Sequence, residues 1–147
     1  MTVFLVMVGG RPAASTNTEI SGPTVLLTPE ASQALAMVLH ELATNAAKYG
    51  ALSSNEGRVS IWWDRRPNGR PLPNLVLEWR EVGGPRVCAP GKSSYGTSTI
   101  QDLIPYEFGG TVDLVFAAEG VRCRLELPPG WLTNAAEPTE IVADTAR

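Results

Sequence analysis

The sequence is poor in the residues that mark metal-chelating, disulfide-stabilised or nucleic-acid-binding chains. Its 147 residues include one histidine and two cysteines, Cys88 and Cys123, too few for a zinc cluster or a disulfide framework. Lys and Arg number 12 against 15 Asp and Glu, so no basic nucleic-acid face is expected. The apolar start, Met1–Val8, is too short to cross a bilayer and lacks a signal-peptide pattern. These absences predict a cytoplasmic protein with reduced thiols, no membrane span and no nucleic-acid partner.

The remaining composition suits one globular domain, because 44% of the residues are hydrophobic. Residues 9–22, rich in Gly, Pro, Ser and Thr, are expected to form a loop, and residues 24–28 a short strand. Thr28 then caps a helix over residues 29–49, and Gly50 ends that helix.

Two pairs of alternating segments predict β-hairpins, one turning at residues 68–69 and the other at residues 119–120. Between the hairpins, residues 97–108 are expected to form a second helix, which Pro105 should shorten or kink. Helices before and between hairpins predict an α+β fold, a two-layer α/β sandwich with a mixed sheet. The expected strands cover residues 58–64, 74–81, 111–117 and 121–127.

Three polar side chains on the first helix repeat at helical spacing. Glu41, Asn45 and Lys48 stand at i, i+4 and i+7, so they form one polar stripe. A carboxylate, a carboxamide and an ammonium on one face suit an ATP–Mg²⁺ site. From spacing alone, a solvated helix face is the more ordinary interpretation. The opposite, apolar stripe consists of Leu35, Val38, Leu39, Leu42 and Ala46.

The literal sequence favours the nucleotide site. Residues 40–50, HELATNAAKYG, resemble the N box of sensor histidine kinases of the HWE type. Further along, Trp79–Glu81 resembles the W-x-E element of that family, and Gly83–Pro85 follows it directly. Tyr95–Thr97 stands where the second glycine box of the family belongs. The resemblance covers roughly residues 22–129, and the N box is its most specific part.

This resemblance implies the Bergerat-type ATP-binding fold, with helices on one face of a mixed, mostly antiparallel sheet. It implies a histidine-kinase-like ATP-binding domain over residues 22–130, between an uncertain N-terminal arm (1–21) and a loose C-terminal tail (131–147). The expected cofactors are ATP and Mg²⁺. The loop over residues 83–96 would be the flexible lid of the nucleotide site.

By resemblance, Asn45 binds the metal ion that bridges the phosphates, and few further protein ligands are needed. Glu41 would lie beside the γ-phosphate and orient the attacking group, and Lys48 would neutralise phosphate charge. Lys48 is also an ordinary residue for a helix C-terminus. His40 is a signature residue of the family rather than the phosphoacceptor; a partly buried histidine paired to a neighbour is the alternative.

Glu81 occupies the place of an aspartate that accepts the adenine amino group in related ATPases. The resemblance gives this role to Glu81, and Gly83 and Gly84 would let the backbone pass near the base. Trp79 and Cys123 alternate with apolar residues and are expected in the core.

The end of the expected lid departs from the family pattern. Ser94 replaces a glycine, and Ser98 stands where a basic residue commonly follows the threonine. Gly96 and Thr97, at the start of the next helix, can still cradle phosphate with free N–H groups. These departures bear on nucleotide affinity and catalytic rate rather than on the fold.

Three functions are compatible with these residues. The first is a kinase catalytic domain that passes the γ-phosphoryl group of ATP to a histidine on a separate dimerisation domain, and from there to a response regulator. The second is a nucleotide-binding regulatory module without phosphotransfer, which the single histidine and the altered lid favour. The third is a small ATPase that uses Glu41 as its base. The N box and the W-x-E element favour the kinase.

Overall fold

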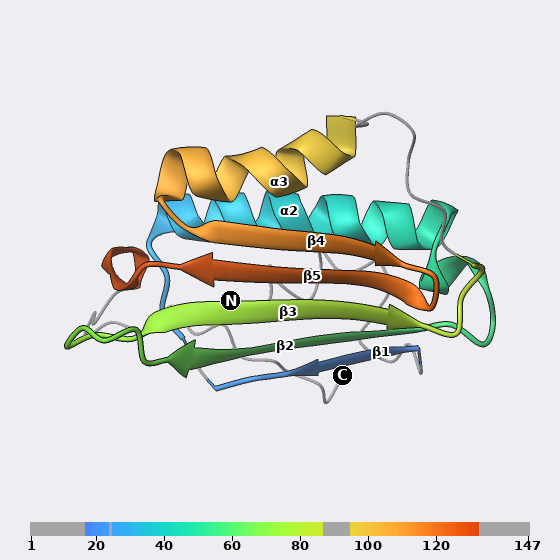
Figure 1. Ribbon diagram of the computed structural model, residues 1–147, viewed down its shortest axis with the longest axis horizontal. Coiled ribbons are helices and arrows are strands. Elements are labelled where there is room, and N and C mark those ends of the chain that lie inside the picture. The colour runs from blue at the N-terminus through green and yellow to red at the C-terminus, as the bar shows by residue number, and fades with distance from the viewer. Residues whose placement is uncertain (1–16, 24, 87–94, 133–147) are drawn as a thin grey trace.

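The computed structural model describes residues 17–23, 25–86 and 95–132, with the backbone alone for residues 95–97 (Figure 1). Five strands form one sheet in the order β1-β2-β3-β5-β4. β1 pairs with β2 in parallel, and every other pair is antiparallel. Figure 1 shows α2 and α3 lying side by side over the sheet. The expected α+β sandwich with a mixed, mostly antiparallel sheet is therefore confirmed.

The elements follow the sequence patterns closely. Both hairpins form with the expected strands, each extended by at most two residues at an end. In chain order the elements are β1 (Thr18–Ser21), α2 (Pro29–Lys48), a 3₁₀ turn η1 (Ala51–Ser53), β2 (Arg58–Arg66), β3 (Asn74–Val82), α3 (Tyr95–Phe108), β4 (Thr111–Ala117), β5 (Gly120–Leu127) and a second 3₁₀ turn η2 (Pro129–Trp131).

Helix α2 begins and ends as its sequence predicts. The Thr28 hydroxyl accepts a hydrogen bond from the Ala31 N–H at 3.3 Å. At the other end, the Tyr49 N–H donates to the carbonyl of Asn45 at 2.8 Å, and Gly50 follows outside the helix. The apolar stripe lies in the core, since Leu35, Val38, Leu39, Leu42 and Ala46 are all buried.

The start of the sheet differs from expectation. Residues 18–21 were predicted as part of a loop, but they form strand β1, which pairs with residues 59–62 of β2. The strand predicted at residues 24–28 does not form in its described part, where Leu27 makes only an isolated bridge to Leu132. β1 is a four-residue edge strand of largely polar sequence, so its partner 41 positions away stabilises it rather than any local apolar pattern.

Helix α3 continues through Pro105 to Phe108, so the predicted shortening is wrong. Proline removes one backbone donor and crowds the preceding turn, which ordinarily disfavours a helix interior. Two buried anchors flank the proline, Ile104 and Phe108, and both pack into the core. The Phe108 carbonyl also accepts a hydrogen bond from the Trp131 indole at 2.8 Å. Tertiary packing thus holds the last turn in place.

The core lies between the helices and one face of the sheet. Trp79 and Cys123 are each about 1% exposed, which confirms their expected burial. Burial, with a smaller effect of the Asp113 carboxylate, raises the pKa of the Cys123 thiol to about 12. Cys88 lies outside the described residues. No helix in the described part of the chain combines the length and apolarity needed to cross a membrane.

Candidate nucleotide-binding site

Three elements that carry predicted site residues end at the same side of the molecule. In Figure 1 the C-terminal end of α2, the C-terminal end of β3 and the N-terminal end of α3 all lie toward the right. The turn η1 follows α2 directly and lies close to it. Residues from the N box, the W-x-E element and the second glycine box are therefore brought to one end of the sandwich.

Glu81 is the one buried charged residue in the described part of the chain, with 4% of its surface exposed. Its Oε1 accepts a hydrogen bond from the Ala51 N–H at 3.0 Å, and its Oε2 accepts one from the Trp79 indole Nε1 at 2.9 Å. Trp79 and Glu81 stand two apart on β3, so both side chains point to the same face. The carboxylate therefore links the end of β3 to the chain just after α2.

The same surroundings set the protonation of Glu81. Burial raises the pKa of its carboxyl group, and the hydrogen bonds from Ala51 and Trp79 oppose that rise because they favour the charged form. Each oxygen of an ionised carboxylate has room for two hydrogen bonds, and each accepts one here. Glu81 can thus accept a further donor, such as the amino group of a purine.

The backbone packs tightly around this carboxylate. Gly83 has φ +73°, and an added Cβ there would lie 2.5 Å from the Glu56 carbonyl oxygen. An added Cβ at Gly84 would lie 2.6 Å from the Ala51 Cα. At Gly50 it would collide with Glu81 Oε1 itself. Gly50 and Gly84 therefore let the end of β3 lie close to the end of the N-box helix, and Gly83 lets the chain pass beside Glu56.

The polar stripe of α2 is present as predicted. Glu41 and Asn45 are half-buried and Lys48 is exposed. Within the described residues no hydrogen bond or ion pair joins these three side chains to one another or to Glu81. The Asn45 carboxamide is half-exposed on the helix and uncommitted to a described partner, which fits a single oxygen ligand for a Mg²⁺ ion carried by phosphates.

The histidine differs from one expectation. His40 is exposed on α2, so the alternative of a partly buried, paired histidine is wrong. Its backbone carbonyl accepts a hydrogen bond from the Thr44 hydroxyl at 2.8 Å, a local contact within the helix. The imidazole faces solvent, where the only histidine of the chain borders the polar stripe.

The second glycine box and the lid are placed in part. Gly96 and Thr97 lie in the first turn of α3, where their backbone N–H groups have no earlier helical carbonyl to bind. Ser98 follows in the same turn and is half-buried. Ser94 and the rest of residues 87–94, the central part of the predicted lid, lie outside the described residues. In the described chain, no three His, Cys, Asp or Glu side chains are grouped closely enough to hold a metal ion.

The sequence interpretation missed two partners of Glu81. Trp79 was assigned to the core alone, yet its indole N–H also fixes the carboxylate. The Ala51 N–H was not considered, because it comes from a separate segment 30 positions away. The spacing of Trp79 and Glu81 on one strand was an available signal for the first contact. No sequence pattern pointed to the second.

A comparison of sequences finds relatives among the histidine kinases. A "Blue-light-activated histidine kinase" from Rhizobium johnstonii is 35% identical over 124 residues, covering 84% of this chain and 35% of the relative. "Blue-light-activated histidine kinase 1" from Erythrobacter litoralis is 42% identical over 112 residues, covering 74% of this chain and 29% of that protein. Over this part of their length, the chain is related in sequence to histidine kinases. It spans about a third of the length of these curated relatives, and no protein-family profile matches it.

Solved structures show which part of a histidine kinase this chain resembles. The catalytic domain of histidine kinase ThkA superposes with a TM-score of 0.57 at 17% identity, covering 86% of this chain and 88% of that domain. The histidine kinase domain of the Erythrobacter litoralis EL346 kinase gives a TM-score of 0.59 at 16% identity, covering 84% of this chain and 55% of that one. The fold is therefore that of a histidine kinase catalytic domain.

Proposed function

We propose that this domain binds ATP with Mg²⁺ and transfers the γ-phosphoryl group to a histidine on a separate acceptor domain. The observation that carries the proposal is the buried Glu81 carboxylate, held by Trp79 and Ala51 beside the end of the N-box helix. A buried carboxylate is costly unless it is hydrogen-bonded, and the two protein donors meet that need here. Each oxygen can still accept one more hydrogen bond, which a ligand could donate. Its position at the end of β3 suits recognition of a purine edge.

The base-binding part of the proposal rests on hydrogen-bond chemistry. The exocyclic amino group of adenine is a donor, and Glu81 supplies an acceptor whose orientation two protein donors already fix. Guanine presents a carbonyl oxygen at the equivalent place, which would meet the carboxylate without a proton between them. Glu81 therefore favours ATP over GTP.

The phosphate-binding part uses the polar stripe of α2. Asn45 would supply the protein oxygen that holds Mg²⁺, which neutralises phosphate charge when bound. Lys48 is exposed and can reach phosphate as a cation, and N–H groups at Gly96 and Thr97 can donate to phosphate oxygens. Glu41, one turn before Asn45, would accept a hydrogen bond from the attacking imidazole and orient it.

The acceptor histidine is proposed to come from a partner domain. His40 is fixed on the same helix as Asn45 and Glu41, so it borders the nucleotide and cannot swing in line with the γ-phosphoryl group. A response regulator would then receive the phosphoryl group from the acceptor domain. The alternatives are a regulatory module that binds ATP without transfer and a small ATPase.

Nucleotide binding is tested by titrating a fluorescent ATP analogue with and without Mg²⁺. Asn45→Ala should weaken Mg²⁺-dependent binding at least about tenfold, a loss of about 1.4 kcal/mol. Gln33→Ala, an exposed substitution on the first half of α2, is the matched control and should bind like wild type. Equal binding by the folded Asn45→Ala variant would rule out the assigned metal ligand.

Base recognition is tested by comparing ATP with GTP. Glu81→Ala should reduce the preference for ATP, whereas Glu78→Ala, on the opposite face of the same strand, should keep it. Circular dichroism checks that both variants are folded. Equal discrimination by wild type and Glu81→Ala would make Glu81 a structural residue.

Phosphotransfer is tested with γ-labelled ATP and a helical-hairpin acceptor domain from a related kinase. Label should appear on the acceptor histidine, fall with Glu41→Ala, and stay absent from the isolated chain. Binding without transfer to any acceptor would favour the regulatory module. Phosphate release without an acceptor would favour the ATPase. Stoichiometric label on His40 would refute the proposed role of that residue.

A further inference from the structure

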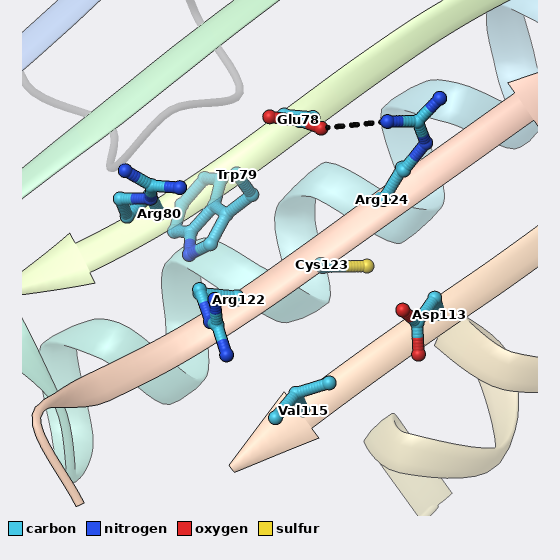
Figure 2. Close-up of a pocket in the computed structure, with 8 residues that line it drawn as sticks. All are labelled: Glu78, Trp79, Arg80, Asp113, Val115, Arg122, Cys123 and Arg124. Atoms are coloured by element: carbon cyan, nitrogen blue, oxygen red, sulfur yellow. Dashed lines mark hydrogen bonds and ion pairs between the residues drawn. The ribbon is translucent and has the colours of Figure 1, made fainter. Parts of the chain in front are cut away.

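A charged hollow lies on the face of the sheet turned away from the helices. Figure 2 shows this hollow in front of the sheet, with a helix behind it. Its volume is about 170 Å³, and it opens to solvent. β3, β4 and β5 line it, and its charged side chains are Arg80, Arg122, Arg124, Glu78 and Asp113.

Two of these arginines occupy directly opposed positions on neighbouring strands. Arg80 on β3 and Arg122 on β5 are direct partners in the antiparallel register, and both are exposed. Like charges at directly opposed positions destabilise a sheet. Their other cross-strand neighbours, Ser60 and Val115, carry no charge that would compensate.

The acidic residues of the hollow are placed toward the third arginine. Arg124 donates to Glu78 at 3.2 Å, the one ion pair found among the described residues, and Asp113 is its direct partner on β4. Arg80 and Arg122 make no hydrogen bond or ion pair in the described part of the chain. The three arginines and two carboxylates leave the hollow with one excess positive charge, and both carboxylates lie toward Arg124 rather than toward the Arg80–Arg122 pair.

We propose that Arg80 and Arg122 bind a phosphate-type oxyanion on this outer face. Planar guanidinium groups match the oxygens of such an anion with paired hydrogen bonds, and the hollow is large enough to hold one. A dianion between the two arginines turns their repulsion into a bridge across β3 and β5. The whole chain has a net charge of −3, so this pair is a local feature rather than part of a basic surface.

This anion site is separate from the proposed nucleotide site. Arg80 is exposed and Glu81, the next residue, is buried, because successive side chains of β3 point to opposite faces of the sheet. The Arg80–Arg122 pair could take free phosphate or a phosphorylated side chain, which share the same recognised group. The proposal depends on neither ATP binding nor phosphotransfer.

The test is thermal unfolding of the 147-residue chain in increasing phosphate, with chloride at matched ionic strength as reference. It is run without Mg²⁺ in a Lys48→Gln background, because Lys48 is the side-chain cation proposed to meet phosphate in the nucleotide site. Arg80→Gln and Arg122→Gln should each weaken the phosphate response at least about tenfold in apparent affinity. Arg65→Gln, the same charge change at an exposed β2 position outside the hollow, should respond like the parent.

Comparing variants separates binding from the general stabilising effect of phosphate salts, which acts on every variant alike. A second arm replaces phosphate by O-phosphoserine, with serine as its control. A response to both phosphate and phosphoserine supports a site open to phosphorylated side chains, and a response to phosphate alone supports a site for the free anion. Equal responses from the parent, Arg80→Gln and Arg65→Gln would overturn the proposal.

Discussion

Strand β3 carries a buried charged residue on one face and solvent-accessible charged residues on the other. On the inner face, Glu81 is almost fully buried and both of its oxygens accept hydrogen bonds from fixed protein donors. On the outer face, Glu78 forms an exposed ion pair and Arg80 lies opposite a second arginine. The inner carboxylate is organised by the fold itself, whereas the outer charges depend on solvent and on what binds there. The contrast separates a proposed site that the fold preorganises from a proposed site that a ligand would complete.

The largest expected difference between the two faces is in the free energy of unfolding lost by Glu81→Ala and by Glu78→Ala. Glu81→Ala leaves the Ala51 and Trp79 donors buried without their acceptor, so we expect a loss of about 3 kcal/mol in the free energy of unfolding. Glu78→Ala breaks an exposed ion pair and should cost less than about 1 kcal/mol. Urea unfolding followed by circular dichroism measures both. Similar losses would mean that burial of Glu81 has no energetic consequence.

Two buried tryptophans provide the next comparison. Trp79→Phe and Trp63→Phe each remove an indole that donates a hydrogen bond, to Glu81 Oε2 and to the Pro23 carbonyl respectively, and each should cost about 2 kcal/mol. Only Trp79→Phe should also raise the pKa of Glu81 further, since its bond favours the ionised carboxylate. Carboxyl NMR titration of Glu81 in the two variants measures this difference. A pKa that stays the same in Trp79→Phe would contradict the orienting role.

The protonation of Glu81 should appear in the pH dependence of stability. Its folded pKa is raised, so the unfolded chain loses this proton first as the pH increases. The contribution of Glu81 is therefore full below about pH 4.5 and is lost as the pH rises through the folded pKa. Each unit of pKa difference corresponds to about 1.4 kcal/mol. Subtracting the stability curve of Glu81→Gln from that of wild type isolates this term, and a flat difference curve would contradict it.

The outer face should give the smallest effect. A double-mutant cycle on Glu78 and Arg124 is expected to yield a coupling energy of about 0.5 kcal/mol or less, because both side chains are partly exposed. The coupling should disappear in about 1 M NaCl, where the screening length is near 3 Å. Urea unfolding of the four proteins measures it. A coupling energy above about 2 kcal/mol that persists in salt would contradict this prediction, because it would mean that solvent does not screen the pair.

The fold could be predicted largely because its main elements carry local signals. The cap at Thr28, the apolar stripe of α2 and the alternation of β3 each depend on residues that are close together in the sequence. β1 was missed because a short polar edge strand depends on its pairing with β2, which no nearby residue reveals. The shortening expected at Pro105 was wrong because packing of Ile104 and Phe108 outweighs the local cost of proline.

In the candidate site too, local sequence patterns could be recognised, and contacts between distant segments could not. Its residue types and their order could be recognised, since the N box and the W-x-E element are contiguous strings. The roles of Asn45, Glu41 and Lys48 remain predictions. The surroundings of Glu81 could not be foreseen, because the Ala51 N–H reaches it only after α2 and β3 have packed together. Spacing on one strand could have suggested the contact with Trp79, but not its length or its partner atom.

The close contact at Gly120 has a consequence for the order in which the chain is built. A side chain there would collide with the Glu81 carbonyl oxygen, so the turn between β4 and β5 presses directly on the backbone that carries the buried carboxylate. During synthesis, residues 50–51 and 79–84 emerge well before Gly120. Until β5 has been made, β3 lacks the partner strand on that side. The surroundings of Glu81 are therefore complete only after Gly120 and β5 have joined the sheet, which makes the proposed nucleotide site a late product of the folding of this domain.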